Sequence, residues 1–231
     1  MLSKTTINLI KKHYSLLMCV FLTMIIQLLI TFCLFFVLRD YDPYLLKNLI
    51  GEHEILQRFP IFLFIILPFF ILYGLFSLID FVEGYYPKFF VFTLISIFYG
   101  FILALGRSFV SNENIVFALL STIVIFSSMI TFATFLINSN VEFLKYGPFL
   151  FFALFLLIIF RIIDIIFVDS DMLTNGLRLF AVLLFSVFII FDTYFILFVK
   201  LGGDRDCIDG AINYYLDFMN IFKNILNFEE D

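Results

Sequence analysis

Residues 177–199 read LRLFAVLLFSVFIIFDTYFILFV, and this stretch decides the class of protein. It is apolar along almost its whole length, and its one carboxylate, Asp192, has apolar residues on both sides. A helix needs roughly 20 apolar residues to cross about 30 Å of hydrocarbon. The stretch is therefore predicted to be a membrane-spanning helix that carries a carboxylate inside the bilayer.

Five further apolar stretches of similar length occur in the chain. They are residues 14–38, 61–79, 89–105, 115–137 and 149–168. Turn-forming residues separate these stretches, and no segment between them is long enough to divide the chain into domains. The sequence predicts an all-α membrane protein, a bundle of six transmembrane helices, in which residues 1–231 form a single polytopic membrane domain.

The composition excludes several classes of protein. Hydrophobic residues make up 63% of the 231 residues and charged residues 14%, whereas soluble domains have about 45–50% and about 25%. The net charge is -5 and no basic run is long, so a nucleic-acid partner is not expected. Cys19, Cys33 and Cys207 form no CxxC or Cys/His cluster. Neither a disulfide nor a metal site of cysteines is therefore expected.

The C-terminal segment, residues 208–228, has a different pattern. Its polar residues recur at steps of four, four, three and four, which places them on one face of a helix. They are Asp209, Asn213, Asp217, Asn220 and Asn224. One interpretation is an amphipathic helix that lies in the headgroup plane. The other, which we favour, is a seventh helix, shorter or re-entrant, whose polar face points into the protein.

Asp192 and Asp217 are expected to lie at the same depth in the membrane. Asp192 precedes Lys200 of the connecting turn by 8 residues, and Asp217 follows Cys207 by 10. At about 1.5 Å per residue these separations are about 12 and 15 Å, so an antiparallel hairpin sets the two carboxylates opposite each other. A carboxylate near the bilayer centre costs about 2.5–3.5 kcal/mol, so both are expected to face the protein interior.

Two carboxylates that meet in this way cannot both ionise at low cost, and they share a proton. Such a pair can act as a pH-dependent latch, and once deprotonated it supplies the oxygen ligands that Ca²⁺ prefers. The alternative is that each aspartate only hydrogen-bonds a neighbouring helix. Elsewhere, Arg161 and Asp164 lie three residues apart in the fifth stretch and are expected to neutralise each other.

Two segments resemble a known family. Residues 191–193 (FDT) with 208–222 (IDGAINYYLDFMNIF) resemble the C-terminal signature of the transmembrane Bax-inhibitor-motif family. Residues 138–151 (NSNVEFLKYGPFLF) resemble the segment between its fourth and fifth helices. The first match is the specific one, and the resemblance spans almost the whole chain. The short N-terminal tail is more similar to the Golgi anti-apoptotic branch than to the longer-tailed lifeguard members.

The resemblance implies a seven-helix bundle of the endoplasmic reticulum or Golgi, which suppresses cell death and leaks Ca²⁺ from intracellular stores. It implies that Asp192 and Asp217 form the pH-sensitive gate and hold Ca²⁺ transiently. Asn213 and Asn220 match motif positions, and with Asp209 they are candidate pathway-lining residues. Some members have a basic residue at the cytosolic end of the second helix that holds the gate shut. Here residues 78–83 read LIDFVE, so that basic residue is missing.

Basic residues near the N-terminus predict the orientation of the chain in the membrane. Lys4, Lys11 and Lys12 precede the first span, which favours a cytosolic N-terminus. Ca²⁺, as the permeant ion, membrane lipids and other apoptosis-regulating membrane proteins are the expected partners, without a cofactor.

Three classes of function are compatible with these features. The first is a Ca²⁺ leak channel, and the second is a non-conducting regulator of cell death that acts through protein partners. The third is an intramembrane aspartyl protease, since paired aspartates can hydrolyse peptide bonds. The GxGD motif of such proteases is missing, so no enzymatic activity is expected.

Overall fold

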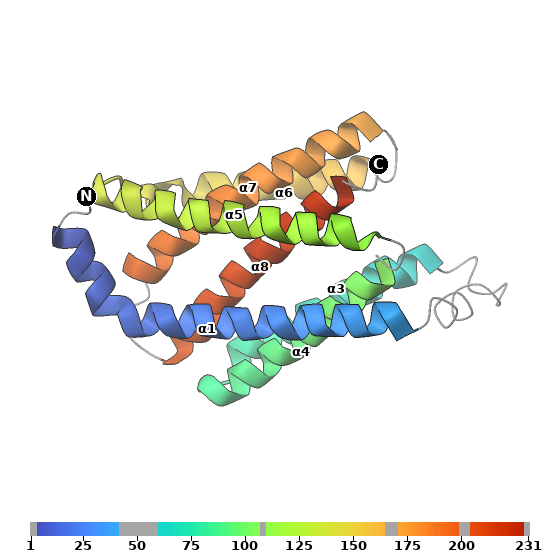
Figure 1. Ribbon diagram of the computed structural model, residues 1–231, viewed down its shortest axis with the longest axis horizontal. Coiled ribbons are helices and arrows are strands. Elements are labelled where there is room, and N and C mark those ends of the chain that lie inside the picture. Colours follow the sequence, from blue (N-terminus) through green and yellow to red (C-terminus); the bar gives the residue numbers. More distant parts are fainter. Residues whose placement is uncertain (1–3, 42–59, 107–109, 165–170, 199–203, 229–231) are drawn as a thin grey trace. The chain divides into compact units, whose positions relative to one another are not determined.

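The computed structural model describes residues 4–41, 60–106, 110–164, 171–198 and 204–228 (Figure 1). These ranges contain seven α-helices and one short 3-10 helix, and no strand occurs in them. The helices are α1 (Lys4–Tyr41), α3 (Pro60–Phe81), α4 (Tyr85–Gly106), α5 (Asn112–Asn138), η1 (Phe143–Tyr146), α6 (Gly147–Ile163), α7 (Asp171–Phe198) and α8 (Asp204–Phe228). The predicted all-α class is confirmed.

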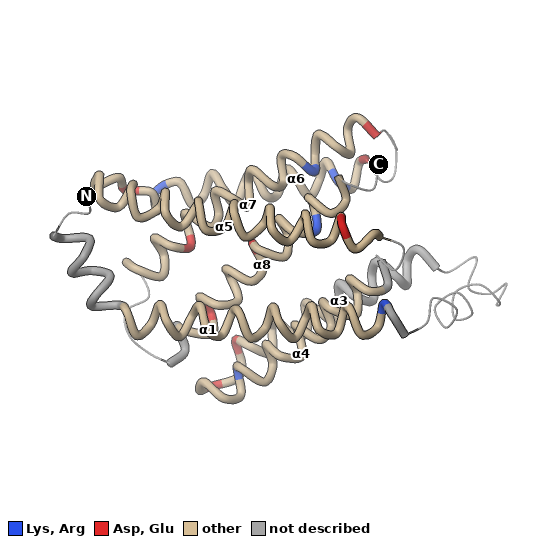
Figure 2. Tube along the Cα trace, viewed as in Figure 1, with Lys and Arg blue, Asp and Glu red and all other residues tan. Residues whose placement is uncertain are grey.

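Five segments in the described ranges are long and apolar enough to cross a membrane. They are Tyr14–Arg39, Tyr85–Ala104, Asn112–Asn138, Phe143–Ile163 and Asp171–Phe198. Helix α3 covers the remaining predicted stretch and is apolar over Phe70–Phe81. Charged residues are few along α5, α6 and α7 (Figure 2). The chain is therefore a membrane protein with several apolar helices. The predicted ends at residues 165–168 and at Val199 lie outside the described ranges.

Local sequence explains where several helices begin and turn. The Ser111 hydroxyl oxygen accepts a hydrogen bond from the Asn114 amide at 3.2 Å and so caps the start of α5. Pro148 lies in the first turn of α6, where its missing N–H costs no helical hydrogen bond. Gly84, with φ of 92°, makes the turn between α3 and α4 in a conformation that favours glycine.

The chain divides into two compact units. The first unit consists of residues 1–19 and 110–231, and the second of residues 20–109. We describe each unit separately, and the single domain expected for residues 1–231 stays a prediction.

In the second unit, α1 and α4 approach each other closely. A Cβ atom added at Gly100 of α4 would lie 2.6 Å from the main-chain oxygen of Thr31, so only glycine allows this approach. Polar side chains form hydrogen bonds across the same interface. Gln27 Nε2 donates to Thr93 Oγ1 at 3.1 Å, and Thr31 Oγ1 lies 3.1 Å from the main-chain oxygen of Ser96. Small and polar residues thus join these two helices, as is common between membrane helices.

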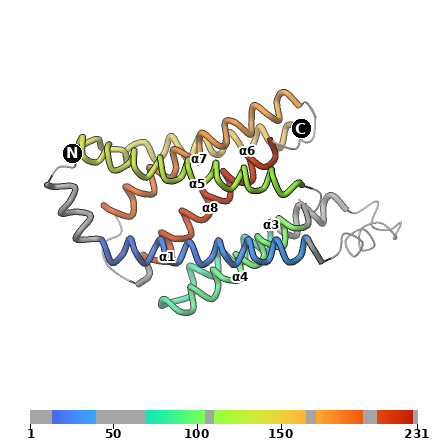
Figure 3. Tube along the Cα trace, in the orientation of Figure 1, coloured from blue at the N-terminus to red at the C-terminus, as the bar shows by residue number. Residues whose placement is uncertain are grey.

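In the first unit, α7 is the central helix. It contacts α5, α6 and α8, and α5 also contacts α8. Following the chain in Figure 3 shows that α7 and α8 run in opposite directions. The apolar cluster between α6 and α7 consists of Leu150, Leu157, Leu177, Ala181, Leu184 and Phe188. The cluster between α5 and α7 consists of Ala133, Ile137, Ile190, Tyr194 and Leu197.

Helix α8 is enclosed by the first unit and does not lie on a surface. Its apolar residues Ile208, Tyr215 and Ile221 are all 0% exposed. On its polar face Asp217 is 5% and Asn224 9% exposed, and the other three residues are half-buried. The helix has 25 residues, a length comparable with the spanning helices. This burial on both faces favours the interior helix over the headgroup-plane helix.

The expectation that no disulfide forms is wrong. Cys19 of α1 and Cys207 in the first turn of α8 are joined by a disulfide, and Cys33 is a free, exposed cysteine. The bonded cysteines are 188 residues apart in sequence. Local spacing therefore contains no sign of the bond, which depends on the start of α8 returning to the start of α1.

Candidate functional site

The antiparallel pairing of α7 and α8 brings Asp192 and Asp217 together. Their carboxyl groups lie next to each other across the contact between the two helices. Asp192 is 7% exposed and Asp217 is 5% exposed, so both carboxyl groups are buried in the first unit. This is the arrangement that the residue count along the two helices predicts. The role of the pair as a gate stays a prediction.

Two neighbouring carboxyl groups can hydrogen-bond to each other only when one of them carries a proton, because two carboxylates can only accept. Acids that lie this close titrate as a coupled pair.

One polar neighbour on α8 supports Asp192. The Asn213 amide Nδ2 donates to Asp192 Oδ1 at 3.4 Å, at the long end of hydrogen-bonding distance. Asn213 lies one helical turn before Asp217, so both residues reach α7 from the same face of α8. Asn213 thus lies beside the pair, and its pathway-lining role stays a prediction.

A second α7–α8 hydrogen bond lies directly beside the pair. Thr193 Oγ1 is 2.8 Å from the Tyr214 hydroxyl and 2.7 Å from the main-chain oxygen of Ile189. Thr193 has one hydroxyl proton, which it donates to Ile189, so Tyr214 is the donor to Thr193. Phe126 of α5 meets the Tyr214 ring edge-on at 5.3 Å between centroids. The aspartate pair therefore lies beside the packed rings of Tyr214 and Phe126.

One oxygen of Asp217, Oδ2, is buried and has no hydrogen-bond partner among the described residues. Leaving a buried polar atom unsatisfied costs about 1–3 kcal/mol, and more for a charged group. Such a cost is typical of functional positions, where it is retained for a reason other than stability. Asp217 is therefore the less satisfied member of the pair.

The other predicted pathway residues occupy different positions on α8. Asp209 precedes Asp217 by 8 residues, about 12 Å along the helix axis, and is half-buried. Asn220 is also half-buried, and its main-chain oxygen accepts a hydrogen bond from Asn224 Nδ2 at 2.8 Å. Neither is part of the group around Asp192, and their pathway role stays a prediction.

Sequence reasoning missed a second polar group, at the C-terminal end of α8. Arg161 Nη2 of α6 donates to Asn224 Oδ1 at 2.7 Å. Asp164 Oδ2 accepts from Thr174 Oγ1 of α7 at 2.6 Å. Arg161 and Asp164 interact electrostatically as expected, and each also hydrogen-bonds a residue of another helix. The i, i+3 spacing relates residues of one helix only. The polar stripe of α8, which includes Asn224, was the feature of the sequence that indicated a polar partner for another helix.

Arg178 of α7 completes this group. Its Nη1 donates to the Asn227 main-chain oxygen at 2.9 Å, one of the last carbonyls of α8, and to Asn175 Oδ1 at 2.8 Å. A cation at a helix C-terminus satisfies carbonyls that have no partner within the helix. Arg161, Asp164 and Arg178 thus join α6, α7 and α8 pairwise and fix the end of α8.

The aspartate pair alone offers few ligands to a metal ion. Among the described residues, no group of three or more His, Cys, Asp and Glu lies close enough to hold a metal ion. Ca²⁺ takes 6–8 oxygen ligands. Two carboxyl groups and one amide supply fewer, so a Ca²⁺ ion there would keep much of its water.

At the end of α3, where the resemblance implies a basic residue, the described structure has acidic residues. Asp80 and Glu83, at the end of α3 and in the turn that follows, are both exposed. They belong to the second unit, whereas the aspartate pair belongs to the first.

Comparison with known proteins gives matches along most of the chain. Residues 11–229 match the family described as "Inhibitor of apoptosis-promoting Bax1". The chain is 32% identical over 166 residues to Bax inhibitor 1 of Schizosaccharomyces pombe, covering 71% of this chain and 60% of that protein. It is 33% identical over 104 residues to the Golgi anti-apoptotic protein of vaccinia virus (strain Lister), covering 45% and 43%. Protein LIFEGUARD 4 of Arabidopsis thaliana is 28% identical over 127 residues, covering 55% and 51%. The matched part spans about half the length of these curated relatives.

Proposed function

Because the chain belongs to the Bax-inhibitor family, the inhibitors of apoptosis-promoting Bax1, we propose that it is an anti-apoptotic membrane protein that acts as a pH-sensitive Ca²⁺ leak channel. The proposed gate is the pair of Asp192 and Asp217. The observation that carries this proposal is the meeting of two buried carboxyl groups on adjacent helices.

The closed state corresponds to the protonated pair. One shared proton joins α7 to α8 through Asp192 and Asp217, and the Thr193–Tyr214 bond reinforces the same contact at 2.8 Å. With the proton in place the pair carries one negative charge and attracts a divalent ion weakly.

The open state follows from loss of this proton. Two ionised carboxylates about 4 Å apart repel each other by about 4 kcal/mol at an effective dielectric constant of about 20. The repulsion replaces an attraction, so the side chains separate, and the pair then offers two negative charges to Ca²⁺. The sign is therefore fixed: a rise in pH favours opening, and a fall in pH favours closure.

The Asn213 side chain has a role in both the closed and the open state. Its amide donates to Asp192 in the closed state. An amide carries a donor on one side and an acceptor on the other, so rotation presents Oδ1 in place of Nδ2. Asn213 thus adds an oxygen to the two carboxylates once they are deprotonated.

The proposed location is the membrane of the Golgi or the endoplasmic reticulum, with the N-terminus in the cytosol. The name of the vaccinia virus relative, Golgi anti-apoptotic protein, supports the Golgi. The lysines before the first span support the orientation.

The second candidate is a non-conducting regulator that acts through membrane-protein partners. The many exposed apolar side chains of α5 and α6, such as Phe117, Phe149 and Phe155, are compatible with helix partners as well as lipid. This candidate predicts that protection from cell death survives loss of both aspartates.

Ca²⁺ efflux from proteoliposomes across a pH series tests the proposal. Asp192→Asn and Asp217→Asn remove the titrating pair while keeping its shape, so we expect the pH response to disappear in each. Asp171→Asn is the matched control, because Asp171 is an exposed acid in the first turn of α7. Wild-type flux and pH response in both pair variants would overturn the gate.

A further inference from the structure

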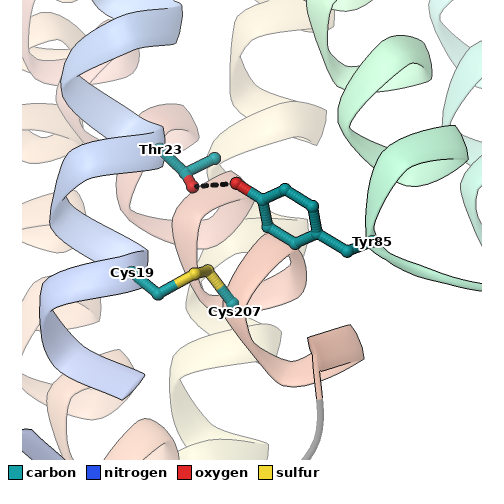
Figure 4. The surroundings of a disulfide bond; sticks show 4 residues. All are labelled: Cys19, Thr23, Tyr85 and Cys207. Atoms are coloured by element: carbon teal, nitrogen blue, oxygen red, sulfur yellow. Dashed lines mark hydrogen bonds between the residues drawn. A yellow bond between two sulfur atoms is a disulfide. The ribbon is translucent and has the colours of Figure 1, made fainter. Parts of the chain in front are cut away.

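The disulfide between Cys19 and Cys207 is a covalent link between α1 and α8. Cys19 lies in α1, and Cys207 lies in the first turn of α8 (Figure 4). Cys207 is 2% exposed, whereas Cys19 is half-buried. Cys19 is therefore the less buried of the two bonded cysteines.

The position of Cys19 along α1 determines which side of the membrane the disulfide lies near. Cys19 lies five residues after Tyr14, where the span of α1 begins. The bond is therefore near the membrane face on which the N-terminus lies. With a cytosolic N-terminus this face meets reduced glutathione, and disulfides that persist there are usually transient and redox-sensing.

We propose that Cys19–Cys207 is a redox-active modification site whose reaction partners are cytosolic thiols, and that its state controls how firmly the start of α8 is held against the rest of the first unit. The consequence for Ca²⁺ flux rests on the function proposed above. The thiol chemistry rests on the cytosolic N-terminus proposed above, and the motion of α8 is independent of the channel function.

The reaction is a two-electron thiol–disulfide exchange. A glutathione thiolate attacks the Cys19 sulfur, which forms a mixed disulfide with Cys19 and releases the Cys207 thiolate. A second glutathione thiolate attacks the sulfur of the bound glutathione and releases Cys19. Two glutathione molecules are oxidised to one glutathione disulfide, and their two protons and two electrons leave Cys19 and Cys207 as thiols.

The geometry connects this bond to the aspartate pair. Cys207 precedes Asn213 by 6 residues and Asp217 by 10, about 15 Å along α8. The opposite end of α8 is held by Arg161 through Asn224 and by Arg178 through Asn227. Reduction therefore removes the covalent link at one end of α8 while the other end keeps its hydrogen bonds, and the unlinked part extends toward Asn213, which contacts Asp192.

The chemical part is tested in sealed vesicles of the Cys33→Ser variant, in which only Cys19 and Cys207 are left to report. Reduced glutathione is added to the N-terminal face or to the opposite face, and thiols are then counted by maleimide labelling after denaturation. We expect no label without glutathione, two labels after treatment of the N-terminal face, and none after treatment of the opposite face. Labels without glutathione, or a bond that resists glutathione on the N-terminal face, would overturn the proposal.

The structural part is tested by hydrogen–deuterium exchange of the same protein before and after reduction. We expect several-fold faster exchange in residues 207–216 and little change in residues 217–228. Unchanged exchange of residues 207–216 after full reduction would disprove the control of α8. Cys207→Ser, read in the same way, reproduces the reduced state without a reductant.

Ca²⁺ efflux separates this inference from the proposed function. If reduction alters labelling and exchange as expected while efflux is unaffected by both aspartate variants, the channel proposal fails and the redox site stands. If the aspartate variants abolish the pH response and reduction changes neither exchange nor labelling, the redox site fails and the channel proposal stands.

Discussion

The Tyr214 hydroxyl donates to Thr193 Oγ1 at 2.8 Å, and this bond joins α8 to α7 next to Asp192. Both residues are almost fully buried, at 0% and 2% exposed. A buried hydrogen bond of this kind stabilises by about 0.5–1.5 kcal/mol. The contact between the two helices thus rests on a neutral bond as well as on the shared proton.

Tyr214→Phe removes that donor and keeps the ring that packs against Phe126. We expect a loss of about 1 kcal/mol in the free energy of unfolding, measured by thermal unfolding in detergent. In a double-mutant cycle with Thr193→Val the two losses should not add, because both remove the same bond. Tyr146→Phe, at an exposed tyrosine, is the control and should change little. Fully additive losses would contradict the proposed bond.

Gly147→Ala should loosen the packing behind the aspartate pair. A Cβ atom at Gly147 would lie 2.9 Å from the ring of Phe191, the residue before Asp192. Overpacking of this kind costs about 1–3 kcal/mol. Gly176→Ala in α7 is the matched control: its Cβ meets nothing within 4 Å, and the change should stabilise the helix by about 0.5–1 kcal/mol. Equal effects of the two substitutions on the unfolding temperature would contradict this packing.

Arg161 and Asn224 should show an interaction energy across α6 and α8. Their bond of 2.7 Å involves a charged donor, so a cycle of Arg161→Met and Asn224→Ala should give about 1–3 kcal/mol of coupling. Asn175 bonds Arg178 instead, so the cycle of Arg161→Met with Asn175→Ala should be additive within about 0.5 kcal/mol. Coupling that is no larger in the first cycle than in the second would argue against the cross-helix bond.

Much of the fold could be predicted from the sequence because membrane helices leave a direct signal. Stretches of about 20 apolar residues are rare by chance, and each predicted stretch falls on a helix. The meeting of Asp192 and Asp217 could be predicted as well, because helical rise fixes depth when the connecting turn is short. The periodicity of α8 indicated one polar face, and burial of that face followed from the cost of exposing Asp217 to lipid.

The remaining features depend on packing between segments far apart in sequence. The disulfide could not be predicted because no local spacing relates Cys19 to Cys207. Arg161 and Asp164 were paired by their spacing on one helix, whereas the structure gives each a partner on another helix. The division of the contacts into two units likewise arises from packing that the apolar pattern does not contain.

In the proposed gate, Asp192 and Asp217 share one proton whose loss opens the pathway. Infrared difference spectroscopy of the reconstituted protein, recorded across the pH series used for Ca²⁺ efflux, measures that proton directly. We expect one protonated-carboxyl band that disappears as pH rises, in parallel with increasing efflux, and that is absent from the pH difference spectra of Asp192→Asn and Asp217→Asn. A band that persists in both variants, or that titrates over a different pH range from the efflux, would contradict the account.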